Sequence, residues 1–524
     1  MSATPPARTR IVALSTDGAS RCWLLPDFLS ASECEAEIAA AQARGFALAG
    51  SDFPPSYRNN RRLVRDDAAL ADALYARLLT HLDAGALEHE AEGRHWRPTG
   101  VNPRLRYCRY APGEAFHLHQ DGVRHEPDGR RSFLTFMIYL DDPARFEGGA
   151  TRFFAHGPDG DAEGDNPVLL ELRPSQGSLI LFDHGLWHDG DEVLAGTKHV
   201  LRSDLLFAAD PAPASDASDE PAPFAPGHAG YVWKLAALRD GSVASAGRDA
   251  RVRLWSADGR LRATLAAHTQ SVLAMTQSDS DTLYTLSRDR TLRRWRLRDM
   301  AETGCVMAHA AAGLALTTDI DGDVISAGAD GELRRWRDLQ PIASRTSAHA
   351  GWVWDLTMLG SMLISVGEDG FARVWDNERF EPLAALAHPH ALRAVAARND
   401  ATGALLACGD MRGAVHLWRR DDRGTWHVLG IQHRHRAAVR ALRWLPDGQL
   451  GSAGEDGRVL ADQASPDATW REVAHHDNFA TDLHAFADGR LLSAGYDGTL
   501  RIGRWHGSRS ADRLSAIASE DWAP

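Results

Sequence analysis

The chain has 524 residues, more than a single hydrophobic core usually supports, so we expect two or more domains. Its 44% hydrophobic and 25% charged residues are the balance of a soluble globular protein. The formal net charge of −13 argues against a broad nucleic-acid-binding surface, because phosphate binding needs a concentrated positive field, although a local basic patch stays open.

We expect no signal peptide and no membrane segment. The start, MSATPPARTRIVALSTDG, has no apolar run long enough for a signal-peptide core, and no stretch approaches 18 consecutive apolar residues. The five cysteines are odd in number and scattered, which is typical of reduced thiols rather than of a disulfide framework or a zinc cluster. These features predict a cytoplasmic protein without membrane partners.

Two helices are predicted before residue 100. Ser30 is expected to cap the first, with Glu33 completing a capping box and Gly45 ending the helix. The second carries one apolar stripe at a four-residue spacing, formed by Leu70, Leu74, Leu78 and Leu82. From residue 104, short apolar runs such as FLTFMIYL and GSLILF alternate with turn-rich segments, which predicts an antiparallel sandwich or barrel.

The segment HLHQDG holds a His-x-Asp pair, His119 and Asp121. Residues two apart on a strand share a face, so this pair can offer an imidazole nitrogen and a carboxylate oxygen to one ion. A third ligand must come from elsewhere, and the candidates are His184, His188 and His199. Two histidines and one carboxylate on one face leave three coordination positions open, which suits Fe(II).

Residues 101–208 resemble the prolyl-4-hydroxylase-like branch of the Fe(II)- and 2-oxoglutarate-dependent dioxygenases, in RYAPGEAFHLHQDG, FEGGATRFF and LWHDGDEVLAGTKHVLRSD. The resemblance implies a double-stranded β-helix, or jelly-roll, and it implies His119, Asp121 and His188 as iron ligands and catalytic residues. A basic residue about ten positions after the distal histidine pairs with the far carboxylate of 2-oxoglutarate in that family, and Lys198 fits this spacing.

The far carboxylate of 2-oxoglutarate needs a cation, since burying its charge without a partner is costly. Lys198 and Arg202 are both possible because their even spacing places them on one strand face, and the family spacing favours Lys198. Tyr139 matches a family tyrosine that donates to the same carboxylate, and Tyr110 matches another pocket tyrosine.

Other residues near the motif are assigned differently. Phe116 stands where many relatives carry Tyr, and Ala150 replaces a common acidic residue; neither is an expected iron ligand. His117 is expected at the pocket edge, next to the ligands. Surface or strand positions are expected for His125, His184 and His199.

Residues 209–227 contain five prolines and four acidic residues and predict an extended, solvated linker. Beyond it the chain repeats itself every 39 to 41 residues, in units with a leading His, a Ser or Thr, and an Asp six residues before a Trp. The four clear units end at Trp255, Trp295, Trp336 and Trp375.

Three weaker units follow. One ends at Trp418 but has Arg412 in place of the Asp; the next keeps Asp456 without the Trp; the last keeps Asp497, with its Trp displaced to 505. The region resembles the WD-repeat family, in which the four side chains of each unit form a hydrogen-bonded set. Seven units predict a seven-bladed β-propeller, a ring without an open sheet edge.

We therefore expect a mainly β protein: a dioxygenase domain (1–208) of jelly-roll fold with flanking helices, a linker (209–227), a seven-bladed propeller (228–506) and a tail (507–524). The resemblance implies hydroxylation of a C–H bond, with Fe(II), 2-oxoglutarate as co-substrate and ascorbate as a candidate reductant. The substrate would be a peptide or protein, prolyl by resemblance only, recruited with other protein partners by the propeller. The alternative is a propeller-based binding protein with an inactive or sensing oxygenase domain.

Overall fold

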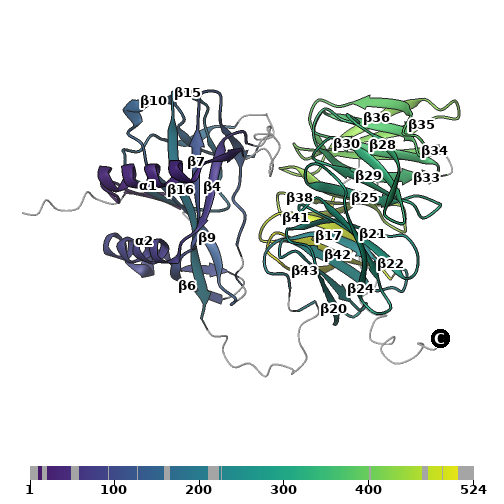
Figure 1. Ribbon diagram of the computed structural model, residues 1–524, viewed down its shortest axis with the longest axis horizontal. Coiled ribbons are helices and arrows are strands. Elements are labelled where there is room, and N and C mark those ends of the chain that lie inside the picture. Colours follow the sequence, from purple (N-terminus) through teal and green to yellow (C-terminus); the bar gives the residue numbers. More distant parts are fainter. Residues whose placement is uncertain are drawn as a thin grey trace, which may run out of the picture.

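The computed structural model describes residues 10–13, 21–48, 58–91, 94–124, 126, 128–157, 166–210, 224–225, 227–400, 403–462, 470–486 and 488–505. These residues form an N-terminal body of two helices and facing sheets, followed by a row of small antiparallel sheets (Figure 1). The protein is mainly β, as predicted. Neither α-helix in the described residues is long and apolar enough to cross a membrane.

Both predicted helices are confirmed. Helix α1 (Ala31–Arg44) begins after Ser30, whose side chain forms the complete capping box with Glu33, and it ends at Gly45. Helix α2 (Ala68–His81) is capped by Asp67 and buries Leu74 and Leu78. Of two short 3-10 helices, η2 (Ala84–Leu87) follows α2 and η3 (Pro143–Arg145) lies between two strands.

The N-terminal body has a large sheet with ten strands in the described residues. Its path is β1 (Arg10–Ala13), β2 (Arg21–Leu25), β13 (Leu179–Asp183), β9 (Arg131–Tyr139), β16 (Lys198–Ala209), β7 (Arg104–Tyr110), β4 (Arg61–Asp66) and β3 (Ala47–Leu48), and off this path β6 (Arg94–Val101) pairs with β16 and with β5 (His89–Ala91). Helices α1 and α2 pack on this sheet through a shared apolar cluster that includes Cys34, Leu74, Leu78, Phe136 and Leu181.

A smaller sheet faces the large one. It consists of β12 (Val168–Leu172), β11 (Thr151–Phe154), β14 (Trp187–Gly190) and β8 (Phe116–His119), and β10 (Phe146–Gly148) pairs separately with β15 (Val193–Gly196). Side chains of both sheets meet in one apolar cluster, for example Met137 and Tyr139 of the large sheet with Phe116 and Phe153 of the small one. Two facing antiparallel sheets agree with the predicted sandwich or barrel; the jelly-roll itself stays a prediction.

Seven consecutive antiparallel sheets follow in the part of the chain that the structure describes. They are β17 (Val232–Ala237), β18 (Val243–Gly247), β19 (Arg251–Trp255), β20 (Leu261–Ala266); β21 (Val272–Gln277), β22 (Thr282–Ser287), β23 (Thr291–Arg296), β24 (Ala301–Met307); β25 (Gly313–Thr318), β26 (Val324–Gly328), β27 (Leu333–Arg337), β28 (Gln340–Arg345); β29 (Val353–Leu359), β30 (Met362–Gly367), β31 (Phe371–Asp376), β32 (Pro382–Ala387); β33 (Leu392–Asp400), β34 (Gly403–Asp410), β35 (Ala414–Arg420), β36 (Trp426–His433); β37 (Val439–Trp444), β38 (Leu450–Gly454), β39 (Arg458–Asp462), β40 (Arg471–His475); and β41 (Ala480–Ala485), β42 (Arg490–Gly495), β43 (Leu500–Arg504).

The row of sheets closes on itself as a propeller does. The first strands of consecutive sheets pack against one another, and β41 also packs against β17. At this seam Thr481 Oγ1 donates to the carbonyl of Val232 at 2.6 Å, and the amide of Leu235 donates to Asp482 at 2.9 Å. The exact number of blades stays a prediction, because the last sheet has three strands within the described residues.

The predicted hydrogen-bonded sets are present in the four clear repeats. In the first, His228 bonds Asp249 at 2.9 Å and Ser245 at 2.8 Å, and Trp255 Nε1 donates to the same Ser245 hydroxyl at 2.8 Å. The fifth repeat differs, because Cys408 replaces the serine. There Trp418 Nε1 donates directly to His388 Nε2 at 3.0 Å.

Both ends of the predicted linker are structured. Strand β16 continues to Ala209, and Asp210 forms an ion pair with Arg97 at 2.9 Å. Phe224 is buried and packs edge-on against Trp255 of the first sheet, with ring centroids 5.6 Å apart. Residues 211–223 and the predicted tail 507–524 lie outside the described residues. All five cysteines are free, as expected of reduced thiols.

Candidate metal centre and co-substrate pocket

Strand pairing brings the two distant halves of the predicted metal site together. Strands β8 and β14 are antiparallel neighbours in the small sheet, and their register places His119 directly opposite His188. Asp121 follows β8 by two residues. Ligand atoms of these three buried side chains all lie within 4.8 Å of one another. Of the three candidate histidines, His188 is therefore the one that lies with His119 and Asp121.

Both imidazoles are oriented by backbone carbonyls. His119 Nδ1 is 2.7 Å from the carbonyl of His117, and His188 Nδ1 is 2.9 Å from that of Leu186. An Nδ1–H that donates to a carbonyl leaves Nε2 as the basic nitrogen, the arrangement common in metal-bound histidines. Both Nε2 atoms face Asp121, at 3.5 Å from Oδ1 for His119 and 3.6 Å from Oδ2 for His188.

The protonation states suit metal binding. Burial lowers the pKa of His119 and lowers that of His188 to about 3, so both imidazoles are neutral at physiological pH. Burial alone would raise the pKa of Asp121, but the Arg202 guanidinium and the nearby imidazoles outweigh it and hold this pKa well below its ordinary value. Neutral imidazoles and an ionised carboxylate are the forms that bind a divalent cation.

Two further side chains fix the carboxylate of Asp121. Arg202 of β16 forms an ion pair with Oδ1, and Thr135 Oγ1 of β9 donates to Oδ2 at 2.5 Å. The structure therefore places Arg202 against the candidate metal ligand Asp121, not beside Lys198 as a partner for a co-substrate carboxylate. Thr135 was not predicted from the sequence, although it lies four residues before Tyr139 on the same strand and so shares its face.

Lys198 is on the same strand as Arg202 but has different neighbours. It is only 4% exposed, its Nζ donates to the carbonyl of Gly149 at 2.6 Å, and it lies over the rings of Tyr110 and Tyr139 at 5.5 and 5.3 Å. No carboxylate among the described residues forms an ion pair with it. Burial lowers its pKa to about 8, which leaves it mostly charged at neutral pH.

Tyr139 adds a hydroxyl to the same region. Its hydroxyl donates to Thr151 Oγ1 of β11 at 2.5 Å, and burial raises the pKa of both Tyr139 and Tyr110, so both stay neutral donors. A buried cation with neutral hydroxyl donors beside it matches the needs of a carboxylate. The grouping of Lys198, Tyr139 and Tyr110 thus follows the predicted pattern.

The remaining histidines do not join the ligand set. His184 Nδ1 lies 3.1 Å from Thr135 Oγ1 and its Nε2 2.8 Å from Ser132 Oγ, so it supports the residue that holds Asp121. His199 bonds Asp141 at 2.9 Å. His117 is exposed and contributes its carbonyl, next to the ligands as predicted. His125 lies outside the described residues.

Phe116, which stands where many relatives carry Tyr, packs on the candidate ligand His119. Its ring stacks on that of His119, with centroids 3.6 Å apart and planes at 19°. Ala150 is buried beside the small sheet. Neither Phe116 nor Ala150 supplies an atom to the candidate metal set.

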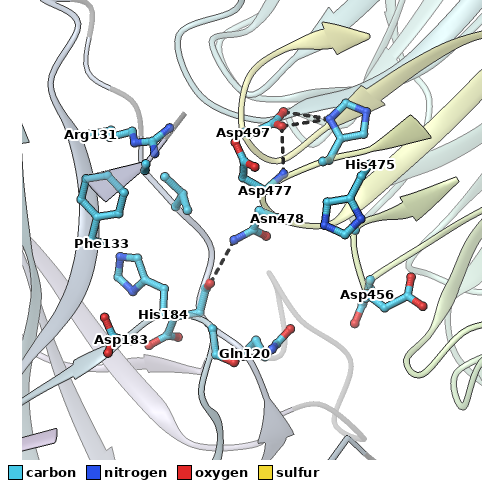
Figure 2. A pocket seen from close by; sticks show the side chains of 17 residues that line it. Gln120, Arg131, Phe133, Asp183, His184, Asp456, His475, Asp477, Asn478 and Asp497 are labelled. Atoms are coloured by element: carbon cyan, nitrogen blue, oxygen red, sulfur yellow. Dashed lines mark hydrogen bonds and ion pairs between the residues drawn. The ribbon is translucent and has the colours of Figure 1, made fainter. Parts of the chain in front are cut away.

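A cavity of about 410 Å³ lies between the N-terminal body and the propeller-like sheets. Its walls include Asp121, Phe133 and His184 on one side, and Asp456, His475 and Asn478 on the other (Figure 2). Asn478 Nδ2 crosses this boundary and donates to the main-chain carbonyl of Asp121 at 3.2 Å. No sequence signal pointed to Asn478, because a contact between domains leaves no spacing pattern.

Comparison with known proteins agrees with this division. Residues 105–203 match the 2OG-Fe(II) oxygenase superfamily, and residues 222–256, 259–296 and 340–376 match the WD domain, G-beta repeat. The chain therefore contains a 2OG-Fe(II) oxygenase domain followed by WD40 repeats. The prolyl-4-hydroxylase-like branch stays a prediction.

Two individual proteins are similar to parts of the chain. A probable cytosolic Fe-S cluster assembly factor from Schizosaccharomyces pombe is 31% identical over 127 residues, covering 19% of this chain and 21% of that protein. The chain thus spans about a fifth of the length of this curated relative. Among solved structures, the WD40 beta propeller domain of Doa1 is 21% identical with a TM-score of 0.47, covering 53% of this chain and 95% of that one.

Proposed function

We propose that the protein is an Fe(II)- and 2-oxoglutarate-dependent dioxygenase that hydroxylates a C–H bond of a peptidyl, prolyl-like substrate recruited by its propeller. The observation that carries the proposal is the pairing of a buried His119–Asp121–His188 set with a separate buried cation, Lys198, on the strand whose Arg202 contacts Asp121. A histidine cluster with only a structural role would not need a separate buried cation such as Lys198.

The residues present fit both groups. His119, Asp121 and His188 would hold Fe(II) through two imidazole nitrogens and one carboxylate oxygen, leaving three positions for co-substrate and dioxygen. Lys198 would pair with the far carboxylate of 2-oxoglutarate, with Tyr139 and Tyr110 beside it. When bound, the two groups supply an oxidation in which dioxygen, 2-oxoglutarate and a C–H bond give succinate, carbon dioxide and a C–OH group.

The chain itself supplies orientation and exclusion of water. The carbonyls of His117 and Leu186 fix the ring orientations, while Arg202 and Thr135 fix the carboxylate of Asp121. Apolar side chains, including Phe153, Phe182 and Val200 of the two sheets and Val193 of β15, form one cluster and are almost fully buried. A dry, shaped pocket keeps the oxidising chemistry directed at the substrate.

The direct test is turnover without a known substrate. Purified protein given Fe(II), 2-oxoglutarate and ascorbate as reductant should release succinate above a His119→Ala, Asp121→Ala double variant. The double variant should also bind less Fe(II). Equal succinate release and equal iron binding by the two proteins would refute the oxygenase proposal.

The alternative, a propeller-based scaffold with an inactive or sensing oxygenase domain, makes a different prediction. Such a protein would retain partner binding through the WD40 repeats without any 2-oxoglutarate turnover. The intact ligand set and Lys198 favour the enzyme. Mass spectrometry for an added oxygen on proteins captured by the full chain during turnover would identify the substrate and the hydroxylated atom.

A further inference from the structure

The propeller touches the loop that carries Asp121. Asn478, which lies two residues before β41, donates from Nδ2 to the Asp121 carbonyl at 3.2 Å, and its Oδ1 accepts from the amide of Phe479 at 2.7 Å. The second bond fixes the side-chain amide within the propeller, so the first bond ties Asp121 to a preset position. Figure 2 shows the Asn478 side chain pointing toward the oxygenase body.

The next residue, Gly122, meets the propeller even more closely. A methyl group on Gly122 would lie 2.7 Å from Tyr231 Oη and 3.3 Å from Tyr496 Cδ2. The backbone of Gly122 is not in the left-handed region, so its own conformation does not demand glycine. The close approach of the two tyrosines does.

These tyrosines form a firm surface. Their rings stack with centroids 4.0 Å apart and planes at 8°, and Trp233 and Phe479 pack around Tyr496 at 5.0 and 4.7 Å. Arg440 donates to the Tyr496 hydroxyl at 3.2 Å. Rings packed on several sides have little freedom to withdraw from the loop.

A second loop of the oxygenase domain is held in a similar way. A methyl group on Gly157 would lie 2.6 Å from the carbonyl oxygen of Arg436 in the propeller and 2.9 Å from Trp187 Cζ2. Trp187 immediately precedes the ligand His188. The propeller therefore contacts the loop that carries Asp121, and it also contacts Gly157, which lies against the residue next to His188.

We propose that the propeller is a structural part of the metal centre, with Asn478 and the Tyr231–Tyr496 stack acting as positioning residues that hold the Asp121 loop. This inference rests on the proposed function and deepens it: the WD40 repeats complete the site in addition to recruiting substrate. Groups that orient a metal ligand typically change metal affinity by about 10- to 100-fold when removed.

The first experiment compares Asn478→Ala with Asn399→Ala in the full chain. Asn399 is an exposed residue near the end of β33, the first strand of the fifth propeller sheet, whereas Asn478 precedes the start of the first strand of its sheet. The same change at Asn399 therefore leaves the oxygenase domain untouched. Binding of Co(II), with its visible absorption spectrum, reports affinity and ligand geometry without turnover. We expect Asn478→Ala to weaken binding about 10-fold and to change the spectrum, and Asn399→Ala to match the wild type.

The second experiment tests the contact at Gly122 by compensation. Gly122→Ala should weaken Co(II) binding, and adding Tyr231→Ala should restore much of it, because removing the ring makes room for the methyl group. The Tyr231→Ala single variant completes the cycle and should itself bind Co(II) more weakly than the wild type, so restoration is measured against Gly122→Ala. Restoration separates a clash with the propeller from an intrinsic defect of the loop.

The outcomes distinguish this inference from the proposed function. If the wild type binds Co(II) and releases succinate but Asn478→Ala and Gly122→Ala behave like it, the positioning role is wrong and the oxygenase assignment stands. If the wild type binds no metal at its His–Asp–His set, both are overturned. If Gly122→Ala does not fold, the Asn478→Ala comparison decides alone.

Discussion

Arg202 forms an ion pair with Asp121, the acidic member of the candidate metal set, while Lys198 on the same strand lies over Tyr110 and Tyr139. The two cations share one face of β16, yet they occupy different parts of the pocket. One balances the ligand carboxylate, and the other is available to a carboxylate from outside. Replacing Arg202 should therefore affect stability, whereas replacing Lys198 should affect the binding of 2-oxoglutarate.

Replacing Arg202 should destabilise the protein. An Arg202→Met variant leaves the ionised Asp121 buried without its partner, at a cost of about 3 kcal/mol in the free energy of unfolding. Urea denaturation of chelator-treated protein measures this, with Arg202→Lys as the variant that keeps the charge and should lose less. Equal stability of wild type and Arg202→Met would show that the ion pair contributes nothing.

Binding of 2-oxoglutarate should weaken at alkaline pH. Because burial lowers the pKa of Lys198 to about 8, its charged form is present below that pH and is lost as pH rises through it. The dissociation constant for 2-oxoglutarate should therefore be flat below about pH 8 and rise by up to tenfold per pH unit above it. Anaerobic titration at fixed Fe(II) measures this constant.

The matched variant for that pH profile is Lys198→Arg. A guanidinium keeps its charge well above pH 10, so the alkaline loss should disappear even if the overall affinity falls. Lys198→Met should bind 2-oxoglutarate weakly at every pH. An unchanged alkaline profile in Lys198→Arg would assign the pH dependence to another group.

Tyr139→Phe should raise the KM for 2-oxoglutarate about tenfold, because the Tyr139 hydroxyl would turn from Thr151 to the bound carboxylate and a hydrogen bond to a charged group is worth about 1.5 kcal/mol. The matched control is Tyr107→Phe, a buried tyrosine whose hydroxyl bonds Glu37 outside the pocket at 2.5 Å. Both variants lose one buried hydroxyl. A similar KM in the two would argue that Tyr139 has only a packing role.

The WD40 hydrogen-bonded sets predict a difference between repeats. Ser365 bonds His349 at 2.7 Å and Trp375 at 2.8 Å, so Ser365→Ala should lower the free energy of unfolding by about 2 kcal/mol. Cys408→Ala, at the corresponding position of the fifth repeat, should cost less, because His388 and Trp418 bond each other directly. Thermal unfolding of the two variants checks the order.

Much of this arrangement could be predicted from the sequence because it depends on local spacing. The capping box at Ser30 and Glu33 involves residues three apart, and the repeats involve a His, Ser, Asp and Trp at fixed offsets. The ligand pair His119 and Asp121 also lies within one short motif. Such patterns are written directly in the order of residues.

The contacts that could not be predicted join segments far apart in the chain. Residue spacing alone left His184, His188 and His199 open as the third ligand; the family resemblance favoured His188, and the register of β8 and β14 places His188 opposite His119. The partner of Arg202 depended on how Asp121 turns back toward β16, and the burial of Phe224 depended on the first propeller sheet. Periodicity shows which face a side chain occupies, but not which residue faces it.

The bond between Asn478 and Asp121 spans 357 residues of chain. During synthesis the oxygenase domain therefore leaves the ribosome long before its propeller contact exists, and the seam between β17 and β41 forms only when the last sheet has been made. In the proposed arrangement, the metal centre is completed only after Asn478 has been made. A nascent chain that stops before Asn478 would then carry an oxygenase domain whose Asp121 loop lacks its propeller contact.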